Sequence, residues 1–252
     1  MSIRNNYKHT LTASYFGYIT QAIVNNFAPL LFVTFQRSFG ISLEKIAGLV
    51  TVNFFMQLVV DLASAKFIDR IGYRVSIVAA HLFAGAGLIM LGTLPFALPD
   101  PYIGLLISIG FYAVGGGLIE VLISPIVEAC PTDKKSAAMS LLHSFYCWGH
   151  VAVILLTTLF FVTAGIKKWH FLAYLWAIIP FANAVYFCLV PINSLAAEGG
   201  AAPMKELFKS KLFWILAVLM VCSGASEQAM SQWSSAFAEA GLKVSKTVGD
   251  LL

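Results

Sequence analysis

Two carboxylates lie within stretches of the chain that are long and apolar enough to span a membrane. Glu120 interrupts the run 111–125, and Glu227 interrupts the run 211–237. A charge near the centre of a bilayer costs at least about 2.5 kcal/mol, so an acidic residue there usually faces a cavity, a partner or a proton path. The sequence therefore predicts that Glu120 and Glu227 bind a polar ligand or exchange protons.

Glu120 belongs to a polar face of its own helix. Tyr112, Gly116, Glu120 and Ser124 follow one another at steps of four, which places them on one side of a helix. An aromatic ring beside a few directed polar groups suits a sugar, and glycine lets a ligand or a neighbouring helix approach closely. The alternative is a structural ion pair, but no other apolar stretch holds Lys or Arg at mid-depth.

The first apolar stretch carries a polar stripe. Tyr18, Gln21 and Asn25 recur at helical spacing, and Asn26 stands beside them. Hydrogen bonding between helices would account for one such residue, whereas four together favour a cavity.

His143 shares a helical face with Cys147 and His150. These residue types bind zinc, but the two histidines lie two turns apart, beyond the reach of one ion without other ligands. We expect polar cavity lining and no metal or other cofactor. The candidate ligand-binding residues are Tyr18, Gln21, Asn25, Asn26, Tyr112, Glu120, Ser124, His143, Glu227 and Trp233.

Composition shows which elements must position these residues. The chain has 59% hydrophobic and 11% charged residues and a mean hydropathy of +0.83, whereas soluble domains carry about 25% charged residues. This composition predicts an all-α polytopic membrane protein surrounded by a lipid bilayer. The scattered basic residues argue against nucleic acid as a partner. Stretches long enough to span a membrane run over about 11–35, 45–67, 75–97, 102–128, 138–164, 170–192 and 211–237.

Lys and Arg in the loops predict the orientation. With the N-terminus inside, the inner loops hold ten basic residues and the outer loops six, which favours a cytoplasmic N-terminus. The first apolar stretch is too long for a signal peptide and is expected to be retained. The expected location is a plasma membrane, specifically a bacterial inner membrane.

The second stretch ends in a charged connection. Asp61 lies near the inner end of a face that it shares with Asn53 and Gln57, and we expect it to form a helix-packing or gating ion pair rather than to contact substrate. The connection that follows has the form Asp-Arg-x-Gly-x-Arg. Its residues are Asp69, Arg70, Gly72 and Arg74. It resembles the inner loop between helices 2 and 3 of the major facilitator superfamily, with Ala65 in place of the first Gly of that pattern. The resemblance implies a gating role for this loop, which stabilises the outward-open state.

Other stretches resemble the fucose-permease-like sugar branch of that superfamily. They are 25–29, 117–120 with 124–125, 142–146, 224–227 and Trp233. The resemblance implies that Glu120 handles substrate and protons. The branch has an aspartate on helix 1 where this chain has Asn26, and an amide does not carry a proton. Glu120 and Glu227 are then the remaining mid-depth groups that titrate.

The resemblance covers the first half of a twelve-helix transporter and one further helix. It implies a six-helix bundle over 1–192, a cytoplasmic linker over 193–210, and the start of a second bundle over 211–252, with helix 7 and the onset of helix 8. The small Ala and Gly residues and the proline of the linker support this division.

We therefore expect a transporter, not an enzyme, that moves a small polar solute, a sugar, by alternating access with coupling to protons. A complete chain is expected to act as a monomer. A multidrug or metabolite exporter of the same fold is one alternative. A seven-helix receptor is another, suggested by the number of apolar stretches alone.

Overall fold

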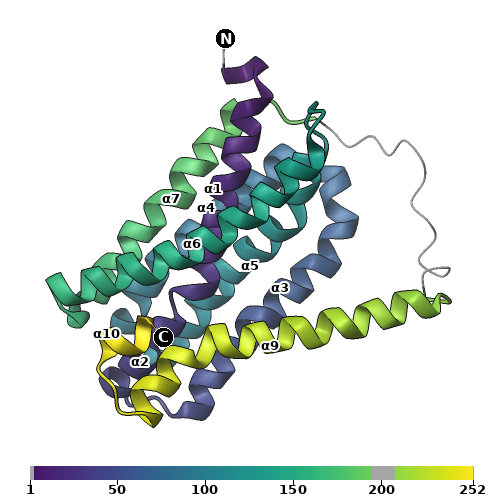
Figure 1. Ribbon diagram of the computed structural model, residues 1–252. Coiled ribbons are helices and arrows are strands. Elements are labelled where there is room, and N and C mark those ends of the chain that lie inside the picture. The colour runs from purple at the N-terminus through teal and green to yellow at the C-terminus, as the bar shows by residue number, and fades with distance from the viewer. Residues whose placement is uncertain (1–2, 194–207, 252) are drawn as a thin grey trace.

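The computed structural model describes residues 3–193 and 208–251, apart from the side chains at positions 65, 66 and 69. The described residues form helices and turns, without a strand (Figure 1). The helices are η1 (Ile3–Asn5), α1 (Tyr7–Asn26), η2 (Pro29–Leu31), α2 (Phe32–Phe39), α3 (Leu43–Ile71), α4 (Tyr73–Ala97), α5 (Pro101–Glu128), α6 (Lys135–Ala164), η3 (Ile166–Lys168), α7 (Trp169–Leu189), α9 (Lys211–Gly241) and α10 (Lys246–Leu251).

Seven candidate membrane spans are found among the described residues, and the first of them, Tyr7–Phe39, combines α1, η2 and α2. The prediction of an all-α membrane protein is confirmed. Polar caps define where several spans begin. The side chains of Ser42, Asp100 and Ser210 accept hydrogen bonds from backbone N–H groups in the first turns of α3, α5 and α9, which satisfies donors that have no partner within the helix.

The first predicted span, 11–35, is not one continuous helix. α1 ends at Asn26, and the chain resumes as a short 3-10 turn that starts with Pro29. Proline has no N–H and cannot donate to the carbonyl four residues earlier. That carbonyl belongs to Asn25, and it accepts a hydrogen bond from Gln232 Nε2 of α9 at 2.9 Å instead.

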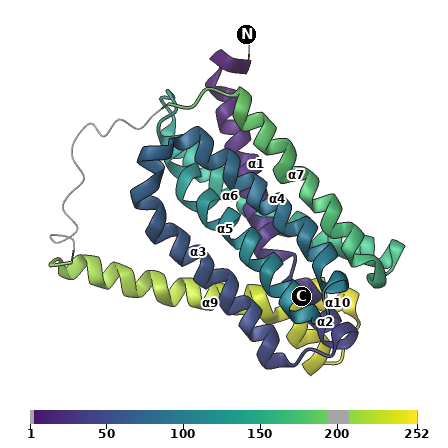
Figure 2. The ribbon, with the colours of Figure 1, turned by 180° about the vertical axis from the view of Figure 1, so that it is seen from behind.

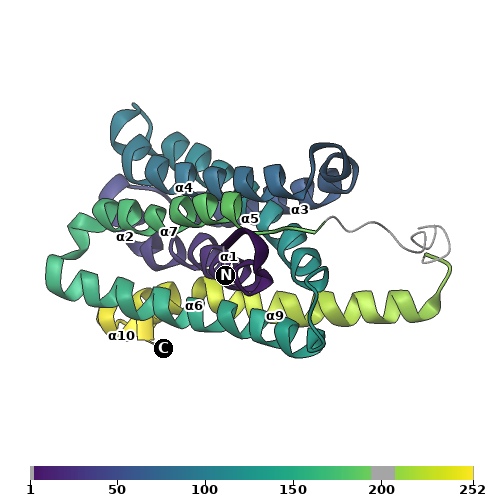
Figure 3. The ribbon, with the colours of Figure 1, turned by 90° about the horizontal axis from the view of Figure 1, so that it is seen from above.

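Helix α1 lies at the centre of the bundle. It packs against α5, α6 and α7, while α4 packs against α5 and α7, and α3 packs on α5. The view from above shows α1 between the layer of α3, α4 and α5 and the layer of α6 and α9 (Figure 3). The view from behind shows α3 along the opposite side of the bundle from α7 (Figure 2).

The glycines of the run 115–117 permit close packing of α5. A Cβ at Gly115 would lie 2.5 Å from the backbone of Ala80 and Ala84 on α4. A Cβ at Gly116 would lie 3.1 Å from Gln21 of α1, and one at Gly117 would lie 3.1 Å from the backbone of Gln57 on α3. This run therefore brings three helices close to the helix that carries Glu120.

Helix α9 joins the bundle at one end only. Its N-terminal half is largely exposed and extends away from the other helices (Figures 1 and 3). Its C-terminal half contacts η2 and α2, and α10 packs against α9 and α6. Most of the predicted linker over 193–210 falls on residues 194–207, which lie outside the described residues.

Candidate substrate cavity

A cavity of about 460 Å³ lies among α1, α3, α5, α6 and α9. Its wall contains the predicted residues Tyr18, Gln21, Asn25, Glu120, His143 and Glu227. It also contains Phe54, Gln57, Leu58, Asp61, Tyr146 and Gln228, which were not among the candidate ligand-binding residues. The two mid-span carboxylates, which are far apart in the sequence, therefore line one cavity. The volume is in the usual range for a small-molecule site.

Side-chain amides organise the wall nearest to Glu120. Gln21 Nε2 donates to Glu120 Oε2 at 3.4 Å and to Gln57 Oε1 at 3.3 Å. Gln57 Nε2 donates to Asn25 Oδ1 at 3.0 Å and to Asn53 Oδ1 at 3.2 Å. The network joins α1, α3 and α5, so that the position of the carboxylate depends on three helices at once.

Aromatic side chains form the wall between α1 and α6. The ring centroid of Tyr18 lies 5.6 Å from that of His143 and 6.4 Å from that of Tyr146. The Tyr18 hydroxyl is 3.0 Å from Ser124 Oγ on α5. Ser124 is not part of the cavity wall and contacts Tyr18 instead.

Tyr112, Asn26 and Trp233 also lie outside this cavity. Tyr112 is 2% exposed and lines a small pocket of about 10 Å³ together with Asn25. Asn26 Oδ1 accepts a hydrogen bond from Ser231 Oγ at 2.9 Å, and the ring of Trp233 lies 5.4 Å from that of Phe32. Tyr112 shares a helical face with Glu120, but it lies two turns away, about 12 Å along the helix, and packs between helices.

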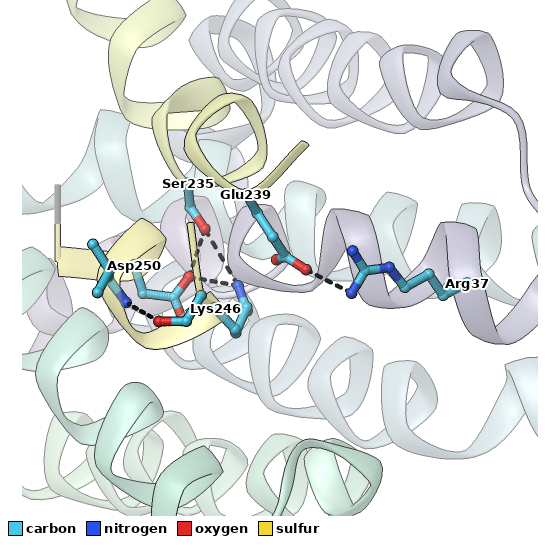
Figure 4. Close-up of polar contacts among 7 residues, drawn as sticks. Arg37, Ser235, Glu239, Lys246 and Asp250 are labelled. Carbon is cyan, nitrogen blue, oxygen red and sulfur yellow. Dashed lines mark hydrogen bonds and ion pairs between the residues drawn. The ribbon is translucent and has the colours of Figure 1, made fainter. Parts of the chain in front are cut away.

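At the end of the bundle away from the N-terminus, contacts between α9 and the first span close the cavity (Figure 1). We call this group the outer contacts. They comprise the hydrogen bonds of Ser231 and Gln232 and an ion pair of 2.8 Å between Arg37 and Glu239. Figure 4 shows Arg37 extending to Glu239, with Ser235 and Lys246 both bound to Asp250 close by. Towards the opposite end α9 diverges from the bundle, so the closure is one-sided.

Asp61 lies on α3 near the end of the second candidate span, which runs over Leu43–Ser64. It lines the cavity, and it forms no ion pair with any other residue whose side chain the structure describes. Its Oδ1 atom is buried and accepts no hydrogen bond. The expected ion pair of Asp61 stays a prediction, because the nearby side chains at positions 65, 66 and 69 lie outside the described part of the chain.

The predicted gating loop forms the turn between α3 and α4. Gly72 has φ +89°, a conformation that only glycine adopts readily. Arg74 donates from one Nη1 atom to the carbonyls of Phe187 at 2.7 Å and Cys188 at 3.1 Å, at the C-terminal end of α7. Arg70 is exposed, and the side chain of Asp69 lies outside the described part of the chain.

A family model described as Major Facilitator Superfamily matches residues 14–250. The chain belongs to the major facilitator superfamily. A search of curated proteins finds no match to it. The family indicates a multi-pass membrane transporter that binds small molecules, rather than an enzyme or a seven-helix receptor.

In this major facilitator protein, several cavity-lining residues that were not among the candidate ligand-binding residues follow a helical spacing that is visible in the sequence. Asn53, Gln57 and Asp61 recur at steps of four along α3, and the last two line the cavity. Tyr146 lies one turn after His143 and faces the same space. Among the described residues, no group of three His, Cys, Asp or Glu side chains could hold a metal ion.

Proposed function

We propose that this transporter moves a small polar solute of the sugar class by alternating access. The supporting observation is the cavity of about 460 Å³, which α9 shares with four helices of the first bundle. The outer contacts close one end of it, while α9 diverges at the other. Relative rocking of the two bundles would close the second end and open the first, so that the cavity faces each side of the membrane in turn.

The sugar assignment rests on the chemistry of the wall. Sugars are bound by flat aromatic surfaces together with a few well-placed hydrogen-bonding groups. Tyr18 and Tyr146 offer rings, while Gln21, Gln57 and Asn25 offer amides. The exporter alternative predicts a more apolar wall, suited to lipophilic molecules.

Glu120 is our candidate for coupling to protons. It combines a position in the cavity with a direct hydrogen bond to Gln21. Protonation would remove its charge and turn one of its oxygens into a donor, which changes what the amide network accepts. Glu227 on α9 is the second candidate, because it lines the same cavity from the other bundle.

The test is uptake into proteoliposomes with an imposed pH gradient. We expect Glu120→Gln to lower sugar uptake by at least about tenfold and to abolish its dependence on the gradient. Glu128→Gln is the matched control, because Glu128 lies on the same helix at its exposed end, 3.5 Å from Lys135. Unchanged uptake and pH dependence in Glu120→Gln would remove the coupling role.

Two further assays separate the remaining possibilities. Uptake of lipophilic cations in place of sugars would favour the exporter. Protease protection of an N-terminal tag tests our proposal that the N-terminus is cytoplasmic in a bacterial inner membrane. That orientation is supported by the basic residues, because the loops on the side of the N-terminus hold ten of them and the opposite loops hold six.

A further inference from the structure

Several hydrogen-bond acceptors in the cavity wall have no donor. Gln21 Oε1, Asp61 Oδ1 and Gln228 Oε1 are buried and accept no hydrogen bond, and all three residues line the cavity. Gln21 is only 3% exposed. A buried acceptor without a partner costs about 1–3 kcal/mol, so these atoms favour a ligand that brings donors.

The orientation of the Gln21 amide is determined by its neighbours. Its Nε2 atom donates to the Glu120 carboxylate and to Gln57 Oε1. Rotating the amide by 180° would turn its oxygen towards both acceptors. The unsatisfied atom of Gln21 is therefore an acceptor in the favourable orientation.

Three acidic side chains give the cavity wall a negative charge. Asp61, Glu120 and Glu227 line the cavity from α3, α5 and α9, and His143 lines it from α6. No lysine or arginine is among the described lining residues. Clefts lined by charge of one sign raise the local concentration of the opposite charge and disfavour ligands of the same sign.

We propose that the cavity selects solutes that carry a protonated amine together with hydroxyl groups, such as an amino sugar. The hydroxyls supply donors to the amide oxygens, and the ammonium supplies donors and positive charge to Asp61 and Glu227. This inference rests on the proposed function, because it specifies the substrate class of the same cavity.

The experiment measures ligand affinity by isothermal titration calorimetry with the protein in nanodiscs, at neutral pH, where the amine is largely protonated. The probes are glucosamine, glucose, N-acetylglucosamine, gluconate and ethanolamine. We expect glucosamine to bind roughly tenfold or more tightly than glucose, as for a hydrogen bond to a charged group. N-acetylglucosamine should lose this advantage, and gluconate should bind most weakly.

Two variants assign the preference to its residues. Asp61→Asn and Glu227→Gln should each lower the ratio of glucosamine to glucose affinity by several fold, because the lost charge weakens glucosamine binding more than glucose binding. Glu128→Gln, outside the cavity, should keep the ratio. Melting temperatures of the ligand-free variants identify one that fails to fold, and the other variant then decides.

The outcomes separate this inference from the proposed function. Equal affinity for glucosamine and glucose, or tighter binding of gluconate, overturns the amine preference and leaves sugar transport standing. Binding of ethanolamine without binding of any sugar supports the amine preference and overturns the sugar class. Tighter binding of glucosamine that is unchanged in both variants overturns the assignment to Asp61 and Glu227.

Discussion

Gln57 has the largest number of amide partners in the cavity wall. It accepts from Gln21 and donates to Asn25 and Asn53, and it is buried. Each of these partners is itself buried, so losing Gln57 leaves several polar groups without a substitute partner. Its contribution to stability therefore exceeds that of a single hydrogen bond.

We expect Gln57→Leu to lower the free energy of unfolding by about 1–3 kcal/mol, because it removes donors and acceptors from buried amides. Thr51→Val is the matched control, since Thr51 is exposed on the same helix and its hydroxyl bonds only to the carbonyl of Ala47. Thermal unfolding in detergent measures both. Equal melting temperatures would show that the network adds no stability.

At the scale of helices, the spacing of residues in the sequence predicted which of them share a side of a helix. It did not predict which residues on that side line the cavity. Glu120 and Tyr112 share one side of α5, yet only Glu120 lines the cavity, because Gly116 and Gly117 let α1 and α3 close over the rest of that side. Which helix covers which glycine depends on tertiary packing, and one sequence does not contain that information.

Asp61 shows the same limit. Its place near the end of a span was predictable, and the candidate span ends at Ser64, but its part in the cavity wall depends on how α3 packs against the other helices. The helical class and the spans were predictable from hydropathy, since a run of about 20 apolar residues is long enough to cross a bilayer.

The contact of α5 with α4 provides a test at this scale. We expect Gly115→Ala to destabilise the protein by about 1–3 kcal/mol, because the added methyl group overlaps the α4 backbone and forces the helices apart. Gly110→Ala on the same helix meets nothing within 4 Å and should be neutral or stabilising by about 1 kcal/mol. Thermal unfolding of the two variants in parallel gives the comparison, and equal losses would contradict close packing at Gly115.

At the scale of the whole molecule, the ion pair between Arg37 and Glu239 is one of the outer contacts, and its two side chains differ strongly in exposure. The Arg37 side chain is 70% exposed, whereas that of Glu239 is 6% exposed. Removing the arginine leaves a buried carboxylate without its counter-ion, and hydration of that carboxylate then favours separation of α9 from α2.

We expect Arg37→Ala to increase labelling of a cysteine at Val50, which lines the small pocket beneath these contacts, by several fold. A membrane-impermeant maleimide added on the side of α2 is the probe. The exposed Cys147, Cys188 and Cys222 are first replaced. Cys130 can stay, because burial raises the pKa of its thiol to about 11 and so keeps it unreactive.

The charge-swapped pair, Arg37→Glu with Glu239→Arg, is the control for this experiment and should restore the low labelling. If Arg37→Ala is labelled no faster than the parent protein, the ion pair does not help to hold this end closed.

The interruption between α1 and η2 at Pro29 affects whether the end held by the outer contacts is open or closed. The carbonyl of Asn25 has no donor within its own helix, and Gln232 reaches it only while the outer contacts are formed. Opening that end exchanges this bond for water, whereas an unbroken helix would keep the carbonyl satisfied in both states. A net hydrogen bond of about 1 kcal/mol corresponds to roughly a fivefold ratio of populations. On the proposed alternating-access mechanism, the interruption at Pro29 thus favours the state in which this end of the cavity is closed.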